Sequence, residues 1–228
     1  MSTTDIPAFN DVDVSQLDIL KPSKKKSSGP FEGAVMYAKG EKPLVLQVKG
    51  LSLISNIEIA SDGGLRCNYE VDTQGKFAEF LFSLDQRVVE ITAGACLDWF
   101  SRTLEKDVLE NNYSRSMRVH RGKHAQFRTK TAVSMCKPDV VIEDKNGQPI
   151  KHEDVPENET VDVTLRLRAI IYHQQLFSPC WETIKVSCCN LQVQPEQSSP
   201  DQEDGQSKLR RILEKARDNI EDQLRALN

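Results

Sequence analysis

The chain has 228 residues, 38% of them hydrophobic, and a formal net charge of −4. That length suits one large domain or two small ones. The lack of any run of 18 apolar residues argues against a transmembrane helix, and residues 1–10 lack the basic-then-apolar pattern of a signal peptide. We therefore expect an intracellular protein without a membrane partner.

The six cysteines are not arranged as a metal or redox motif. No CxxC pair occurs, and the four histidines show no zinc-ligand spacing relative to the cysteines. Nucleotide-binding and hydrolase motifs are also absent. Cys136 lies among basic residues that could lower its thiol pKa, but a structural strand cysteine is the favoured interpretation. We expect a binding protein with no catalytic residues, no metal and no cofactor.

Residues 1–30 are predicted to form a flexible basic arm. The lysine run at residues 24–26 is followed by Ser, Gly and Pro, a composition that buries little apolar area. The arm is interpreted as a solubilising tail. A second phosphate contact or a weak nuclear signal stays open.

Residues 31–193 are predicted to form one β-rich domain with an inserted helix. Strand-like runs occur between residues 44 and 71, with a turn at Asp62-Gly63-Gly64. Residues 77–84 form another apolar run. From Val88 to Leu104 the apolar spacing is mostly helical, and a further short helix is expected to follow Thr103. Trp99 and Phe100 are expected to be core residues of that first helix.

The segment from Tyr113 to Lys137 concentrates positive charge. It has seven Lys and Arg, two His and no carboxylate, whereas the rest of the chain carries 23 Lys and Arg against 34 Asp and Glu. A local segment free of acids creates a positive potential that a polyanion can find. A solvated, salt-bridged β-hairpin is the alternative interpretation.

Strands are expected again beyond the basic segment. Asn146-Gly147 lies between apolar runs and predicts a hairpin turn. Residues 161–172 alternate in polarity, which is typical of a strand with one buried face. Residues 181–193 form the last predicted strand, in which Cys188 and Cys189 point to opposite faces.

The C-terminal part separates into two predicted segments. Residues 194–206 contain four acids and no base, and are predicted to be an acidic linker. Residues 207–228 are predicted to be an amphipathic helix, with Ser207 as its N-cap. That helix is short for an isolated coiled coil, so it either packs on its own domain or associates with another helix. We expect a homo-oligomer through this segment.

The order of elements from Val88 to Val193 resembles single-stranded-DNA-binding proteins of large double-stranded DNA viruses. The matching features are the helix that ends in Leu97-Asp98-Trp99-Phe100-Ser101, the basic strand from Ser116, the strand–turn–strand at residues 140–150, and the final long strands. The resemblance implies an α+β fold, mainly antiparallel β, arranged as an OB-like barrel with inserted helices and a C-terminal helix.

The resemblance also implies a function and a site. The function would be sequence-independent binding of single-stranded DNA in viral DNA replication or recombination, in the host nucleus or at a cytoplasmic viral replication site. Basic residues would contact phosphates and aromatic residues would stack on bases. The implied site residues are Arg115, Arg118, Arg121, Lys123, Phe127, Arg128, Lys130, Arg166, Arg168, Tyr172, Phe177 and Trp181.

A second function is compatible with the same sequence. A structural or scaffold protein, such as a virion or adaptor β-domain, could oligomerise through residues 207–228. Its basic segment would then contact an acidic partner or face solvent. Binding of a single-stranded oligonucleotide at low salt distinguishes the two functions.

Overall fold

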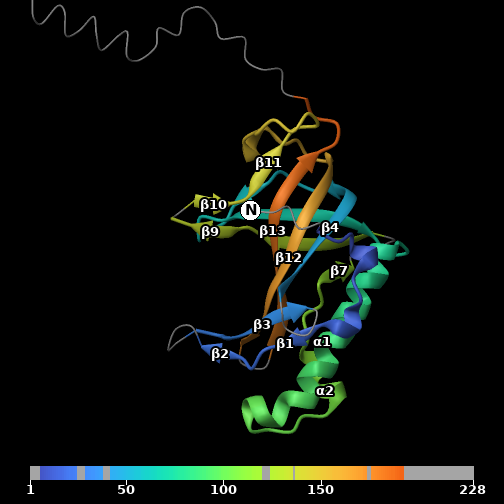
Figure 1. Cartoon of the computed structure of the whole chain (residues 1–228), viewed down its shortest axis with the longest axis vertical. Helices are drawn as coiled ribbons and strands as arrows, with labels where there is room; N and C mark the ends of the chain where they lie inside the picture. The colour runs from blue at the N-terminus through green and yellow to red at the C-terminus, as the bar shows by residue number, and fades with distance from the viewer. Residues whose placement is uncertain are drawn as a thin grey trace, which may run out of the picture. The chain divides into compact units, whose positions relative to one another are not determined.

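The structure is a computed structural model that describes residues 6–24, 29–37, 42–119, 124–135, 137–173 and 176–192. It is an α+β fold dominated by antiparallel strands, as expected (Figure 1). The predicted linker and C-terminal helix lie outside the described residues, as do Arg121, Lys123 and Cys136. The helices are α1 (Lys76–Phe100) and α2 (Lys106–Asn112), with short 3-10 turns η1 (Phe9–Asp11), η2 (Val14–Gln16) and η3 (His152–Asp154).

Five long strands pair in a closed ring. The circuit runs β12–β4–β6–β8–β13 and returns to β12. All of these pairings are antiparallel except β13–β8, which is parallel and consists of Glu182 opposite Lys130. The described strands are β1 (Asp18–Ile19), β2 (Ser23–Lys24), β3 (Phe31–Tyr37), β4 (Lys42–Leu53), β5 (Glu58–Ile59), β6 (Leu65–Asp72), β7 (Met117–Val119), β8 (His124–Lys130), β9 (Ala132–Ser134), β10 (Lys137–Asp139), β11 (Val141–Glu143), β12 (Thr160–His173) and β13 (Leu176–Cys188).

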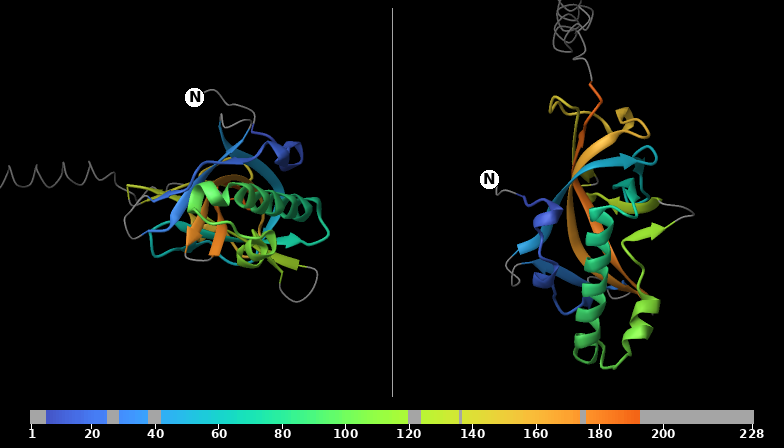
Figure 2. Two further views of the ribbon diagram at one scale, coloured as in Figure 1. Left: turned by 90° about the horizontal axis from the view of Figure 1, so that it is seen from below. Right: turned by 90° about the vertical axis from the view of Figure 1, so that its right-hand side faces the viewer.

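The ring is held together by apolar side chains that point to its interior. On β12, Val161, Val163, Leu165 and Leu167 are buried, which confirms the predicted alternation. Helix α1 packs its own apolar stripe into the same core, and Figure 2 shows the helix running alongside the strands. The ring of Phe77 on α1 meets Phe127 on β8 edge to face, with 5.6 Å between centroids.

Helix α1 is longer than predicted. It begins at Lys76, so the apolar run at residues 77–84 belongs to the helix. The helix ends at Phe100, and the next residue, Ser101, has a φ of 54°, the left-handed conformation of a helix C-cap. Trp99 and Phe100 pack against Tyr172, which confirms their structural role. In the described part of the chain, no helix has the length and apolar character needed to cross a membrane.

The described part of the predicted flexible arm is folded onto the domain. Leu17 and Ile19 are only 2% and 4% exposed and belong to the main core. Strand β1 pairs with β3, and Phe9 meets Phe77 of α1 edge to face. The prediction of a flexible arm is therefore wrong for residues 6–24, because alternating apolar residues outweigh the local polar composition.

The predicted turn at Asn146-Gly147 is confirmed. Gly147 has a φ of 77°, which favours glycine, and the Asp144 carboxylate accepts hydrogen bonds from the backbone of Asn146 and Gln148. Across the turn, Glu143 at the end of β11 forms an isolated antiparallel bridge with Pro149. Cys188 is buried and Cys189 exposed, as their adjacent strand positions predicted.

Two leucines of the N-terminal segment test its docking. Leu17→Ala should lower the free energy of unfolding by about 2–5 kcal/mol, because it leaves a cavity in the core. The matched control Leu20→Ala should change it by less than about 0.5 kcal/mol, because Leu20 is 48% exposed. Urea denaturation measures both. Equal effects would contradict the docked arrangement.

Candidate nucleic-acid interface

The basic segment forms β7, β8 and the residues that lead into them. Along β8, Ala125, Phe127 and Thr129 face the core, while Arg128 and Lys130 are exposed. The period of two residues in a strand therefore puts the basic side chains of β8 on the outer face of the ring. Strand β7 pairs antiparallel with β8 and adds exposed Arg118 beside it.

A hollow opens where β8 and β13 separate. The two strands share one residue pair, after which β8 continues with β6 and β7 while β13 continues with β12. The space between them has a volume of about 160 Å³. Its lining consists of Ser114, Arg115, Ser116, Arg118, Gln126, Arg128, Ser178, Pro179 and Trp181, with no acidic residue among them.

Among the described residues, Arg118 and Arg128 of this hollow have no neighbouring acid, whereas Arg115 interacts electrostatically with the Asp85 carboxylate. Within the described ranges, Arg115, Arg118 and Arg128 have no carboxylate within ion-pair distance. The hydroxyl groups of Ser114 and Ser178 also line the hollow and can donate hydrogen bonds to an anion. Guanidinium groups match phosphate oxygens in a bidentate geometry. The hollow can therefore hold a phosphate group or another small anion.

A buried carboxylate fixes the chain segment that borders the hollow. Asp85 of α1 is 5% exposed and accepts hydrogen bonds from Tyr113 Oη (2.8 Å), Ser116 Oγ (2.7 Å) and the Ser116 backbone N–H (3.0 Å). Trp181 Nε1 in turn donates to Ser116 Oγ at 3.1 Å. Helix α1, the segment before β7 and strand β13 are thus joined by one polar network beside the hollow.

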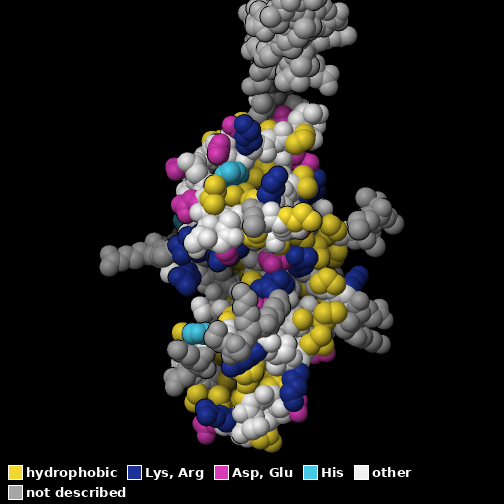
Figure 3. Space-filling model, turned by 90° about the vertical axis from the view of Figure 1, so that its left-hand side faces the viewer, with side chains coloured by type: hydrophobic (Ala, Val, Ile, Leu, Met, Phe, Trp, Pro, Cys, Tyr) yellow, Lys and Arg dark blue, Asp and Glu magenta, His cyan; other side chains and the backbone are white. Residues whose placement is uncertain are grey.

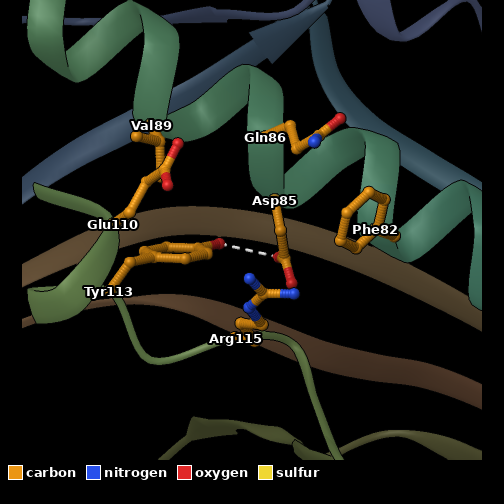
Figure 4. A pocket seen from close by; sticks show the side chains of 7 residues that line it. All are labelled: Phe82, Asp85, Gln86, Val89, Glu110, Tyr113 and Arg115. Atoms are coloured by element: carbon orange, nitrogen blue, oxygen red, sulfur yellow. Dashed lines mark hydrogen bonds between the residues drawn. The ribbon is translucent and has the colours of Figure 1, made fainter. Parts of the chain in front are cut away.

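Arg115 lies between the two anchored residues and borders a second, smaller hollow. Figure 4 shows this hollow, of about 60 Å³, with Arg115 below Asp85 and Phe82 beside them. The Arg115 guanidinium lies 5.3 Å from the centroid of the Phe82 ring, a cation–π distance. Phe82 is an exposed aromatic residue at the edge of the basic surface.

Sequence reasoning missed both Asp85 and Phe82. Helical periodicity over residues 77–88 could have shown that Phe82 falls outside the buried stripe of Phe77, Leu81, Leu84 and Val88. Asp85, by contrast, falls on the buried side of the helix. A single acid within an apolar helical stripe is a signal for a buried polar partner, but it does not say which partner.

The four aromatic residues predicted to stack on bases are not available to them. Phe127 is completely buried, and Tyr172, Phe177 and Trp181 are each less than 9% exposed and belong to the main core. They pack on one another and on the aromatic side chains of α1. Their predicted stacking role is therefore wrong for this conformation, because the faces of their rings are already occupied.

Arg166 and Arg168 are engaged in ion pairs rather than exposed as an open groove. The buried Glu182 carboxylate accepts from Arg166 Nε at 2.8 Å and lies 3.0 Å from Arg168 Nε. Arg168 also pairs with Glu32 at 2.8 Å. These arginines compensate the buried Glu182 and the half-buried Glu32, which corrects their assignment to the phosphate-binding groove. Figure 3 shows one face of the molecule where Lys and Arg side chains have Asp and Glu side chains between them.

Lys130 is exposed but lies 3.6 Å from Asp62, so it is a weaker candidate than the three arginines. Within the described ranges, no group of three or more His, Cys, Asp and Glu side chains could hold a metal ion. The five described cysteines are free thiols.

Comparison with known proteins gives a family and similar folds. The model of a family of unknown function, DUF5871, matches residues 55–202, which is more than half of the chain. The chain belongs to this family. No curated protein matches it.

Two similar solved structures are phage proteins. One is the single-stranded DNA-binding protein from bacteriophage Enc34 in complex with ssDNA, at 11% identity and a TM-score of 0.44, covering 78% of this chain and 98% of that one. The other is gp2.5, a single-stranded DNA-binding protein encoded by bacteriophage T7, at 6% identity and a TM-score of 0.43, covering 68% and 96%.

The two classes of arginine should separate in a stability measurement. Arg168→Ala should lower the free energy of unfolding by about 1.5–3 kcal/mol, because the Glu182 and Glu32 carboxylates lose a charged hydrogen-bond donor. Arg118→Ala should change it by less than about 0.5 kcal/mol. Urea denaturation of the two variants measures the difference. A loss for Arg118→Ala as large as that for Arg168→Ala would contradict the assignment.

The pH dependence of stability tests the Asp85 anchor. Burial raises the pKa of the Asp85 carboxyl above its ordinary value, although hydrogen bonds from Ser116 and Tyr113 act in the opposite direction. Because the folded state raises this pKa, protonation of Asp85 adds to the free energy of unfolding. That contribution is complete below the pKa of the unfolded chain, about 3.9, and is lost as the pH rises through the pKa of the folded state. From pH ~4 to ~7, the wild type should therefore lose stability relative to Asp85→Asn. Urea denaturation at both pH values measures this, and a relative gain would contradict it.

Proposed function

We propose that this protein binds single-stranded nucleic acid without sequence specificity through the arginine hollow. The hollow is defined by Arg115, Arg118 and Arg128 at the gap between β8 and β13. The observation that carries the proposal is that Arg118 and Arg128 pair with no described carboxylate and, together with Arg115, surround a space whose lining contains no acid. The net charge of −4 makes this local concentration the main feature that a polyanion would meet.

The chemistry of the hollow favours the backbone of a strand over its bases. Arginine and serine donors recognise phosphate oxygens, which carry no sequence information. Arg121 and Lys123, which stand between β7 and β8 in the sequence, remain part of the proposal as further phosphate contacts.

The stacking partner is proposed to be Phe82 in place of the four buried aromatic residues. Its side chain is 43% exposed, and Arg115 links it to the arginine hollow. A base next to a phosphate held by Arg115 would be within reach of this ring. One stacked base contributes roughly 1–3 kcal/mol.

The finer parts of the proposal rest on the resemblance in the sequence alone. They are that the strand is DNA, that it is exposed during viral replication or recombination, and that the protein acts in the host nucleus or at a cytoplasmic viral replication site. The closed ring would serve as the OB-like barrel, and residues 207–228 would join copies of the chain. A scaffold function without nucleic acid is the competing outcome of the experiment below.

Titration of a labelled oligo-dT against the protein tests the function. Binding should be strong at ~50 mM salt and fall steeply towards ~200 mM, with log–log slope of about −0.7 for each phosphate contact on a single strand. The double variant Arg118→Glu/Arg128→Glu should lose at least about tenfold in affinity and show a shallower slope. Fluorescence anisotropy measures both quantities.

A charge-matched double variant serves as the control. Lys145→Glu/Lys151→Glu changes the net charge by the same amount, and these two exposed lysines lie by the turn after β11, outside the lining of the hollow. It should keep near wild-type affinity. Absence of wild-type binding at ~50 mM salt would refute the function. Equal losses in both double variants would show a general charge effect and refute the site.

A further inference from the structure

The β9–β10 hairpin carries an apolar side chain at an unusual position. Met135 lies between the two strands and is 95% exposed, and Val133 on β9 is 41% exposed. The two strands pair with each other as a separate two-stranded sheet. In Figure 1 they project at the side of the molecule away from the ring.

The backbone at Met135 makes this side chain more informative than an ordinary exposed methionine. Its φ of 48° lies in the left-handed region, which Gly and Asn adopt with less strain. A methionine there combines a strained backbone with a large apolar group in water. The left-handed backbone and the exposed apolar side chain are both unfavourable, and neither improves packing within the described structure. A contact made by the side chain with something outside the chain accounts for both.

The hairpin continues directly from the strand that supplies the arginine hollow. Arg128 and Lys130 are on the same outer face of β8, and the chain passes from Lys130 into β9. At about 3.3 Å per residue, Met135 lies at most roughly 23 Å along the chain from Arg128. Lys137 on β10 adds an exposed positive charge next to the tip. A ligand that matches basic side chains beside an apolar tip is an anionic polymer with flat apolar groups, such as a single nucleic-acid strand.

We propose that Met135 inserts between neighbouring bases of the strand whose phosphates occupy the arginine hollow. This inference rests on the proposed function and extends it, because it adds a contact with the bases at the β9–β10 hairpin to the phosphate contacts at β8. Phosphates bind at Arg118 and Arg128, and bases unstack at the hairpin tip. Insertion of methionine and other apolar side chains between base steps is a known way of deforming nucleic acid.

The test uses the full chain and an oligonucleotide that contains 2-aminopurine, whose fluorescence rises when it loses its stacking neighbours. The variant Met135→Asn keeps a residue that adopts the left-handed conformation and removes the apolar group. Leu176→Asn is the matched control, because Leu176 is 61% exposed at the start of β13, on a different hairpin. The urea midpoints of the variants verify that both are folded.

Wild type and Leu176→Asn should raise the 2-aminopurine fluorescence on binding, and Met135→Asn should lose at least about half of that rise and about fivefold in affinity. The salt dependence should stay unchanged in Met135→Asn, because methionine carries no charge. A full fluorescence rise in Met135→Asn, with binding still dependent on Arg118 and Arg128, would overturn this inference and leave the proposed function standing. Absence of wild-type binding at low salt would overturn both.

Discussion

Incomplete pairing between β8 and β13 determines much of the surface of this protein. Each of the other neighbours in the ring shares at least two residue pairs, whereas these two strands pair only at Glu182 and Lys130 in the described structure. Backbone groups and side chains next to such an opening need partners from elsewhere. Ser114 supplies one by donating its N–H to the Phe177 carbonyl at 2.8 Å, and Ser116 supplies another through Trp181. Residues 113–116 thus bridge the opening on one side, and the arginine hollow remains beside them.

Asp85 holds residues 113–116 in place through its hydrogen bonds with Tyr113 and Ser116. A buried carboxylate is costly unless several donors satisfy it, and here the donors come from both anchored residues around Arg115. The cost of burial and the geometry of the basic surface are therefore coupled: the same hydrogen bonds that satisfy the acid hold the arginine-bearing segment against α1. Arg115 then faces two hollows, one with its neighbouring arginines and one with Phe82.

Two sets of arginine residues in one small domain show why charge in a sequence does not identify a binding site. Arg166 and Arg168 alternate with apolar residues on β12, as surface residues do, yet they meet the acids Glu182 and Glu32 from β13 and β3. Arg118 and Arg128 meet no described acid. The difference depends on cross-strand partners that are 14 to 136 residues away in sequence for the paired set, and local patterning contains no information on these.

Residue patterns alone were sufficient for several parts of the molecule. Alternation on β12, the turn at Gly147, the opposite orientations of Cys188 and Cys189 and the packing of Trp99 follow from local periods and turn chemistry. The concentration of basic residues in one acid-free segment is likewise a property of the sequence. The docking of residues 6–24 and the burial of Phe127, Tyr172, Phe177 and Trp181 were decided by the tertiary structure. The physical reason is that burial depends on which distant surfaces meet, and an aromatic side chain gains more from a closed core than from an open groove.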